Sequence, residues 1–195
     1  MLKRARLPAF VAALTALIVA GVPARGAECI AVQAPDSAKA AGADLVLNGL
    51  GIRKATMLKV KVYVAGLYLP EKSNDAAHIL GADQPWQLVL RFVRDVDVSD
   101  MRDAFDEGFE KAAGDKLAAL KQRIETLKAG MADFKKGHYL SFTNDPAKGV
   151  AVDVNGAGGG EIQGADFSKA LLAIWIGAEP PNEDLKSGLL GGKCE

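Results

Sequence analysis

The sequence has few of the residues that most often bind metal ions or act as nucleophiles. Its 195 residues include two cysteines and two histidines, and aromatic residues make up 6% of the chain. His78 and His138 are 60 residues apart, and neither has cysteines or patterned carboxylates beside it, so the spacing of a metal site is missing. The local sequence suggests no Ser-His-Asp set either. We expect neither a bound metal ion nor a cofactor.

An excess of positive charge is also lacking. The chain has 24 Lys and Arg residues against 24 Asp and Glu residues. A surface that binds nucleic acid needs clustered, surplus Lys and Arg, so we expect no nucleic-acid partner. The glycines between Gly156 and Gly160 lack the Lys-Ser/Thr pair of a phosphate-binding loop and the third glycine of a dinucleotide fingerprint. We interpret them as a flexible hairpin tip.

The apolar run at the N-terminus is too short to cross a bilayer, which takes about 20 residues. It covers residues 7–22, follows three basic residues, and gives way at once to a proline and an arginine. This is the pattern of a secretory signal peptide, which we predict over residues 1–26 with cleavage after Ala24 or Gly26. We therefore expect export across the inner membrane to the periplasm and no stable membrane span. The leader contains four basic and no acidic residues, so 20 of the 24 basic residues remain against 24 acidic ones.

The two cysteines, Cys29 and Cys194, lie almost at the two ends of the mature chain. The exported compartment permits disulfides, so we predict that they pair. The alternative is two free thiols on the chain termini. Neither cysteine has a histidine nearby in the sequence, which argues against a catalytic thiol.

The remaining pattern predicts one α+β domain. Residues 27–43 show no sustained period, and we expect an extended lead-in there, with the domain over residues 44–195. Strands with period-two alternation are followed by helices, then by short strands, then by helices, an order typical of an antiparallel sheet with helices on one side. We expect the main strands at 45–53, 56–69, 86–96, 138–143, 150–154 and 161–163, and the main helices at 99–113, 117–134 and 167–176.

Several segments, in this order, resemble the chalcone isomerase-like superfamily, and together they span nearly all of the mature chain. They are LNGLGIRKATMLKVKVYVAGLYL at 47–69, LRFVRDVDVSDMRDAFDEGF at 90–109, KGHYLSFTNDPAKGV at 136–150, NGAGGGEIQGADFSKALLAIWIG at 155–177 and DLKSGLLG at 184–191. The resemblance implies an open-faced β-sandwich, a large antiparallel sheet backed by helices, with a cleft for an apolar ligand between them. It also implies a choice of function, because the family holds chalcone-cyclising enzymes, fatty-acid-binding relatives and bacterial exported members.

Chalcone cyclisation needs a cation and several hydroxyl donors around the reacting ketone. In the resemblance, Arg53 takes the part of the arginine, the strand threonine falls on Tyr63, and the late-helix hydroxyl falls on Ile174. Isoleucine cannot donate a hydrogen bond, and the middle tyrosine and asparagine have no match. We therefore expect no chalcone cyclisation, and the protein need not be an enzyme.

An arginine and a tyrosine facing an apolar cleft suit a carboxylate-headed ligand instead. We predict an exported protein that binds a small apolar acid, fatty-acid-like, with Arg53 and Tyr63 as the polar anchor. The alternatives are an isomerase (intramolecular lyase) for another enone-like substrate and a protein-interaction module with a filled cleft. If the protein is an enzyme, Arg53 and Tyr63 would be its catalytic residues. If they have only structural roles, Arg53 caps a turn or pairs with an acid, and Tyr63 fills the core. We expect the cleft to be lined also by Ala65, Phe105, Phe109 and Ile174, of which Phe105, Phe109 and Ile174 would otherwise be ordinary core residues.

Overall fold

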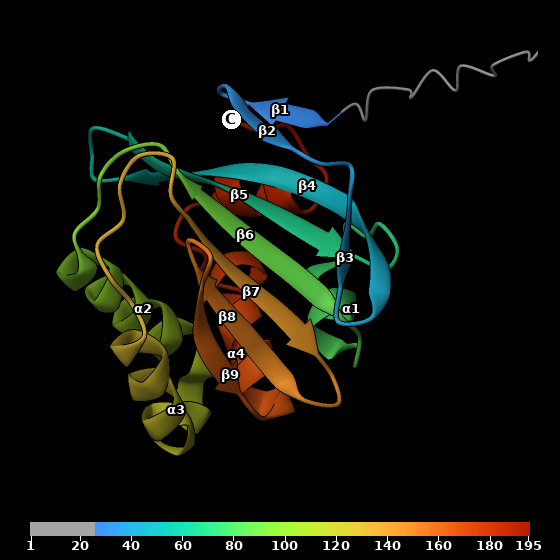
Figure 1. Ribbon diagram of the computed structural model, residues 1–195, viewed down its shortest axis with the longest axis vertical. Coiled ribbons are helices and arrows are strands. Elements are labelled where there is room, and N and C mark those ends of the chain that lie inside the picture. Colours follow the sequence, from blue (N-terminus) through green and yellow to red (C-terminus); the bar gives the residue numbers. More distant parts are fainter. Residues whose placement is uncertain (1–25) are drawn as a thin grey trace, which may run out of the picture.

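A seven-stranded antiparallel sheet organises the computed structural model, which describes residues 26–195 (Figure 1). The predicted signal peptide, apart from its last residue, lies outside the described residues. Each strand pairs with the next along the chain, so the sheet is a simple meander. Its strands are β3 (Ser37–Ala40), β4 (Ala43–Ala55), β5 (Val60–Leu69), β6 (Trp86–Phe92), β7 (Tyr139–Asp145), β8 (Gly149–Val154) and β9 (Ala157–Ile162).

The period-two pattern that predicts β6 is confirmed by burial. Trp86, Leu88, Leu90 and Phe92 are buried on one face, and the residues between them are half-buried on the other. From Tyr63 to Leu69, every residue of β5 is buried and the strand is almost entirely apolar. This is usual for a strand that is covered on both faces. The strand predicted at 86–96 ends earlier, at Phe92, because the chain there leaves the sheet for the first long helix.

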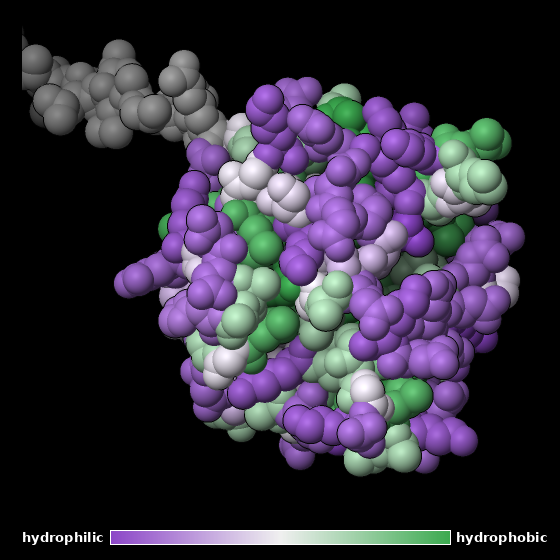
Figure 2. All heavy atoms as spheres, turned by 180° about the vertical axis from the view of Figure 1, so that it is seen from behind, coloured by the Kyte–Doolittle hydropathy of each residue, from purple (hydrophilic) through white to green (hydrophobic). Residues whose placement is uncertain are grey.

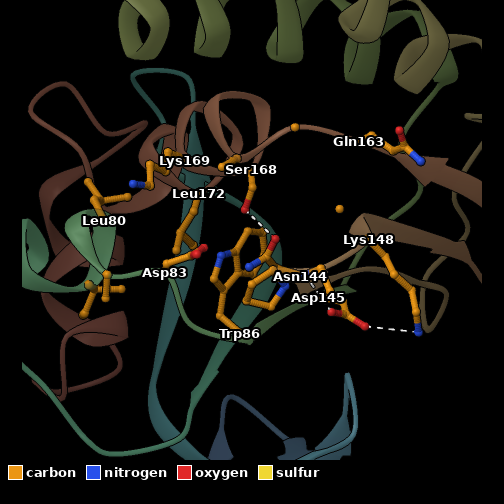
Figure 3. Close-up of a pocket in the computed structure, with 17 residues that line it drawn as sticks. Leu80, Asp83, Trp86, Asn144, Asp145, Lys148, Gln163, Ser168, Lys169 and Leu172 are labelled. Carbon is orange, nitrogen blue, oxygen red and sulfur yellow. Dashed lines mark hydrogen bonds and ion pairs between the residues drawn. The ribbon is translucent and has the colours of Figure 1, made fainter.

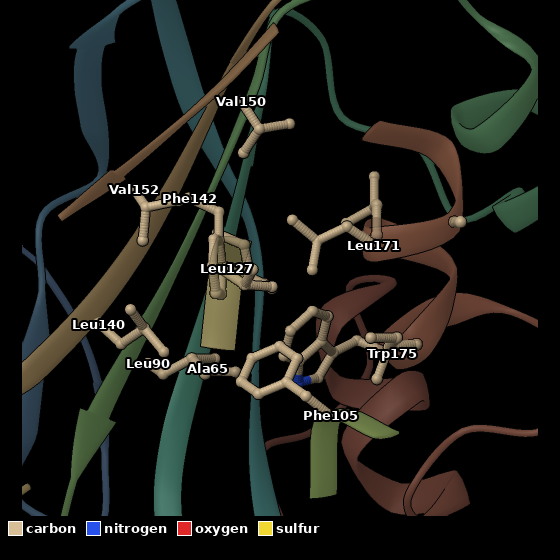
Figure 4. Close-up of a cluster of buried hydrophobic side chains, with 14 of the residues drawn as sticks. Ala65, Leu90, Phe105, Leu127, Leu140, Phe142, Val150, Val152, Leu171 and Trp175 are labelled. Carbon is tan, nitrogen blue, oxygen red and sulfur yellow. The ribbon is translucent and has the colours of Figure 1, made fainter. Parts of the chain in front are cut away.

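Helices cover one face of this sheet. They are α1 (Ala76–Gly81), α2 (Val98–Ala113), the short 3-10 turn η1 (Gly114–Lys116), α3 (Leu117–Ala129), α4 (Ala165–Ile176) and α5 (Glu183–Leu189). Their apolar side chains and those of the sheet form a single buried cluster, with Phe105 of α2 and Trp175 of α4 against Phe142 of β7 (Figure 4). The α+β prediction is confirmed. Within residues 26–195, no helix is both long enough and apolar enough to cross a membrane.

A second, smaller apolar cluster lies on the opposite face of β4 and β5. It is covered by a hairpin of β1 (Ala27–Cys29) and β2 (Val32–Ala34). The disulfide prediction is confirmed, since Cys29 in this hairpin is bonded to Cys194, with 6.0 Å between their Cα atoms. Closing a loop of this length stabilises the fold by about 5 kcal/mol on the chain-entropy model.

The segment expected to be an extended lead-in, residues 27–43, is therefore more structured than its pattern indicates. It contains the β1–β2 hairpin, and β3 pairs with β4 as the edge strand of the main sheet. These strands are three or four residues long and rich in alanine. Such short elements carry no measurable alternation, so only their partners reveal them.

The last helix, α5, packs unusually close to β4. A Cβ atom at Gly49 would lie 2.1 Å from the Gly188 carbonyl oxygen, and one at Gly51 would lie 2.3 Å from that of Leu185. In both cases the added Cβ would meet a backbone atom, which cannot turn away as a side chain could, so only glycine fits at these two positions. Residues alternate between the two faces of a strand, which puts Arg53 on this same helical face, one step beyond the end of the covered stretch.

Candidate functional site

Two cavities lie at opposite ends of α4. The larger, of about 350 Å³, borders the C-terminal end of α4 at Ile174 and Trp175, and lies between α2 and the ends of β4 and β5. The smaller, of about 270 Å³, borders the N-terminal half of α4 (Figure 3). The two differ in chemistry, which decides which of them suits the predicted ligand.

Arg53 lies in the wall of the larger cavity and is half-buried. The sequence predicts it at a hairpin junction, but β4 continues to Ala55 and the turn follows at 56–59. Its Nη1 atom donates hydrogen bonds to the carbonyl oxygens of Lys54 and, at 3.4 Å, of Pro181. Among residues 26–195, no carboxylate forms an ion pair with Arg53, and its Nε and Nη2 atoms make no hydrogen bond. Its positive charge thus has no directly paired carboxylate in the described part of the chain.

Tyr63 lies directly opposite Arg53 in the β4–β5 register. Its side chain is buried, and the Nε1 atom of Trp175 donates a hydrogen bond of 2.9 Å to its hydroxyl oxygen. Burial raises the pKa of Tyr63, and this outweighs the opposing effects of the Trp175 hydrogen bond and the Arg53 charge. The hydroxyl therefore stays protonated at neutral pH, and its own hydrogen is available to a ligand.

The backbone beside Arg53 is held by the segment that leads into α5. Asn182 donates from Nδ2 to the Ile52 carbonyl oxygen and accepts from the Lys54 N–H, both at 3.2 Å. These bonds bracket Arg53, after which the register shifts: Arg53 is opposite Tyr63 and Lys54 is opposite Lys61, so β5 bulges at Val62. Lys54 also forms an ion pair of 2.9 Å with Asp184 in the first turn of α5. A bulge re-aims the side chains next to it, and the neighbouring residues Val62 and Tyr63 both border the cavity.

The inner wall of the cavity is apolar. It is formed by Met101, Phe105 and Gly108 of α2 together with Ile174 and Trp175 of α4. Phe105 and Trp175 pack edge to face, with ring centroids 6.0 Å apart. A Cβ atom at Gly108 would lie 2.8 Å from the Ile174 side chain, so the two helices are closest there. This wall can pack against an aliphatic chain but offers it few polar partners.

Charged residues gather at the rim of the same cavity. Glu107 and Lys111, one turn apart on α2, form an ion pair of 2.5 Å. The hydrogen bond from Lys111 lowers the pKa of Glu107, and the more distant charge of Arg53 adds a smaller effect. Asp95 is paired with Lys135 at 3.2 Å. These two carboxylates have their own cations. Asp100 and Glu179 also border the cavity, and none of the four carboxylates forms an ion pair with Arg53.

The structure brings four of the predicted ligand-binding residues to the larger cavity, namely Arg53, Tyr63, Phe105 and Ile174. Ala65 and Phe109 do not border it, because both are fully buried in the core. Phe109 stacks on Phe167 of α4, with 5.6 Å between ring centroids. A role in ligand binding stays a prediction for all six residues.

Sequence reasoning missed Thr56, Trp175 and Asn182. Thr56 and Trp175 border the cavity, and Asn182 holds the strand that carries Arg53. Trp175 lies in an apolar helical stretch and looks like any core residue, so its bond to Tyr63 has no local signal. Asn182 follows two prolines, a position that predicts a helix cap, and its side chain binds β4 instead.

The smaller cavity is more polar in its lining (Figure 3). The buried Ser168 hydroxyl donates to Asn144 Oδ1 at 2.7 Å, and Asn144 Nδ2 donates to the Gln84 carbonyl oxygen at 2.9 Å. Asp145 and Lys148 form an ion pair of 3.2 Å at its edge. An aliphatic tail would gain little against such a surface, so the larger cavity is the better candidate for an apolar acid.

Comparisons with known proteins agree with the fold. A family model described as chalcone isomerase-like matches residues 26–191. The chain belongs to the chalcone isomerase-like family. A crystal structure of an Arabidopsis thaliana fatty-acid binding protein is similar in fold to this family member, with a TM-score of 0.62 and 19% sequence identity. The match covers 75% of this chain and 87% of that one. A search of curated proteins found no match.

Proposed function

We propose that this family member binds an apolar carboxylic acid, fatty-acid-like, in the cavity between the sheet and α2. The observation that carries the proposal is Arg53, a half-buried guanidinium that borders the cavity and forms no ion pair within residues 26–195. Removing a charge from water is costly unless a partner compensates. A ligand carboxylate would supply that partner.

The donors around Arg53 fit the two oxygens of a carboxylate. A guanidinium presents parallel N–H groups that can bind both oxygens at once. The Tyr63 hydroxyl, on the neighbouring strand in direct register, can add a third hydrogen bond. Each charge-assisted bond contributes about 1.5–3 kcal/mol net. The head group would therefore be oriented mainly by Arg53 and supported by Tyr63.

The apolar wall would supply most of the affinity. Burying one methylene contributes about 0.8 kcal/mol, so about 12 buried methylenes contribute roughly 10 kcal/mol, slightly more than three head-group bonds at their strongest. The volume of about 350 Å³ is at the lower end of the range for ligand pockets, about 300–1,000 Å³. This size favours a compact or short-chain acid, or a longer one whose tail end remains outside the cavity.

The apolar side chain of Ile174 in the cavity wall favours binding without turnover. Ile174 there has no polar group, and the inner wall beside it is aromatic and aliphatic. The structural relative from Arabidopsis thaliana is described as a fatty-acid binding protein, which agrees with this proposal. The disulfide is consistent with an oxidising compartment, and with the predicted leader it supports our proposal that the protein works in the periplasm.

The proposal is tested by titrating the purified protein with fatty acids of increasing chain length. The variant R53A should weaken binding of the acid about 10- to 100-fold, because a charge-assisted pair is lost. It should leave the weaker binding of the fatty alcohol of equal length nearly unchanged. Mass spectrometry of lipids extracted from the protein as purified would identify a ligand that is already bound.

The matched control is R91A. Arg91 is also half-buried and is on the next strand, β6, but it lies over the Tyr139 ring and away from the cavity. Its loss should not change the affinity for the acid. Equal affinities of wild type and R53A, or no affinity of the wild type for any fatty acid, would overturn the proposal.

A further inference from the structure

The hairpin turn between β4 and β5 exposes two large apolar side chains to solvent. Met57 is 100% exposed and Leu58 is 86% exposed, while the next large hydrophobic residue, Ile30, is only 38% exposed. In Figure 2, hydrophobic atoms project at the upper right, where the β4–β5 tip of Figure 1 lies when the molecule is seen from behind. Two adjacent apolar side chains without neighbours are unfavourable in water.

The turn itself is built from unsuitable residues. The Lys59 N–H donates to the Thr56 carbonyl oxygen at 3.0 Å, which puts Met57 and Leu58 at the two central positions. Tight turns favour Gly, Asn, Asp, Pro or Ser there. Thr56 and Lys59 also adopt positive φ angles, 61° and 51°, in the region that favours glycine. Unfavourable turn residues and positive φ angles at non-glycine positions thus occur together in one exposed segment, which indicates a functional role for it.

The charged residues within the tip sequence itself all have one sign. Residues 53–61 include four basic residues and no acidic one. Lys54 is paired with Asp184, whereas Lys59 and Lys61 are exposed and form no ion pair within the part of the chain that the structure describes. Apolar side chains flanked by free lysines match the interface of an anionic bilayer, where the apolar groups enter the acyl boundary and the cations meet the head groups.

The tip is also continuous with the larger cavity. Ala55 and Thr56, the residues that lead into the turn, line that cavity together with Arg53. A bilayer in contact with Met57 and Leu58 would therefore lie beside the cavity opening.

We propose that the β4–β5 hairpin tip is a membrane-contacting element that inserts Met57 and Leu58 into an anionic lipid surface. Lys59 and Lys61 hold it there. Given the proposed binding of an apolar acid, on which this second part rests, the contact lets the ligand pass between the bilayer and the cavity without crossing water.

The test is co-sedimentation with vesicles of phosphatidylglycerol and phosphatidylcholine, compared with vesicles of phosphatidylcholine alone. The full chain is expressed, and its N-terminus is sequenced so that all compared proteins begin at the same residue. The wild type should bind the anionic vesicles and lose this binding as salt is raised. The double variant M57S/L58S should bind at least about tenfold more weakly. Each lysine removed by K59Q or K61Q should cost about fivefold.

Matched controls separate the tip from general stickiness. I30S removes another partly exposed apolar residue from a hairpin turn, and K116Q/K121Q removes two exposed lysines near and on α3. Neither should change vesicle binding. The affinity for a fatty acid in vesicle-free solution should be the same for M57S/L58S and wild type, because the tip side chains do not line the cavity.

Three results would overturn the membrane contact. The first is that the wild-type protein does not bind anionic vesicles, and the second is that M57S/L58S binds them as well as wild type. The third is that the wild type sediments as a dimer and M57S/L58S as a monomer, which would make a second copy of the chain the partner. Vesicle binding through the tip by a protein with no affinity for fatty acids would support the membrane contact and contradict only the proposed ligand.

Discussion

The face of β4 that points toward the helices has two halves. One half is covered by α5 in close contact, and the other borders a cavity. In the first half, Gly49 and Gly51 let α5 approach until backbone meets backbone, and no space remains. In the second half, Arg53 stands on the same face and a cavity of about 350 Å³ borders it. The sheet is the same, so side-chain size and the course of α5 decide where the layers close and where they separate.

The boundary between these halves is polar. Asn182 binds β4 on both sides of Arg53, and Lys54 pairs with Asp184 where α5 begins. On the closed side, the Asn48 side chain donates to the Leu189 carbonyl oxygen at 2.7 Å and continues the attachment. Hydrogen bonds thus fix α5 along the glycines and stop it short of the cavity. The tightly packed contact between α5 and β4 thus supports the strand that carries Arg53 into the cavity wall.

The largest effect should come from breaking the closed half. G49V places side-chain atoms where the backbone of Gly188, Leu189 and Gly191 now lies, as close as 2.1 Å to the added Cβ. We expect a loss of about 3 kcal/mol or more, since α5 must move. Urea unfolding measures it. G158V is the control, because nothing lies within 4 Å of a Cβ at Gly158 in β9, and it should change stability by less than about 0.5 kcal/mol. Similar losses in both variants would contradict the close-packing explanation.

A loss of stability of intermediate size should come from a substitution in the cavity wall. Y63F removes the acceptor of Trp175 Nε1, which is buried, and leaves that N–H unpaired. The expected loss of stability is about 1–3 kcal/mol, with weaker binding of the acid. The comparison is Y139F, whose hydroxyl donates to Asp153 in a less buried position at 3.2 Å. Thermal unfolding that is unchanged in Y63F would show that the Trp175 bond does not support the cavity wall.

The smallest effect should come from the ion pair at the boundary. The hydrogen bond from Lys54 lowers the pKa of Asp184 below its ordinary value of 3.8. A carboxyl group whose pKa is lower in the folded state stabilises the fold above the unfolded pKa, and this stability is lost as the pH falls through the folded pKa. D184N should therefore be slightly less stable than wild type at pH 7. Urea midpoints measured between pH 7 and pH 2 should converge below about pH 3.8. A difference that persists at the lowest pH would contradict this origin.

Alternation and periodicity were enough to predict the order of strands and helices, because each main element has a long apolar face. They failed for β1 to β3, whose few small residues carry no pattern. The cleft lining expected from the family resemblance also included Ala65 and Phe109, which do not border the cavity. Both lie on the helical side of the sheet, but only the packing of α4 determines that they are covered completely.

The arrangement of the candidate site depends on the register between β4 and β5, which local sequence patterns do not determine. That Arg53 stands opposite Tyr63 follows from the turn at 56–59 and from the β5 bulge at Val62. That Tyr63 meets Trp175 follows from the position of a helix 112 residues later in the chain. A one-residue shift would turn either side chain to the other face of the sheet.

The sequence by itself determined the α+β architecture, the pairing prediction for its two cysteines and the presence of a single arginine in the first long strand pair. These follow from local periodicity and from composition. Only the tertiary structure decided that α5 closes one half of β4 and leaves the other open, that Arg53 has no ion pair among the residues from 26 onward, and that Met57 and Leu58 project into solvent. Each of these depends on contacts, or on their absence, between segments distant in the chain.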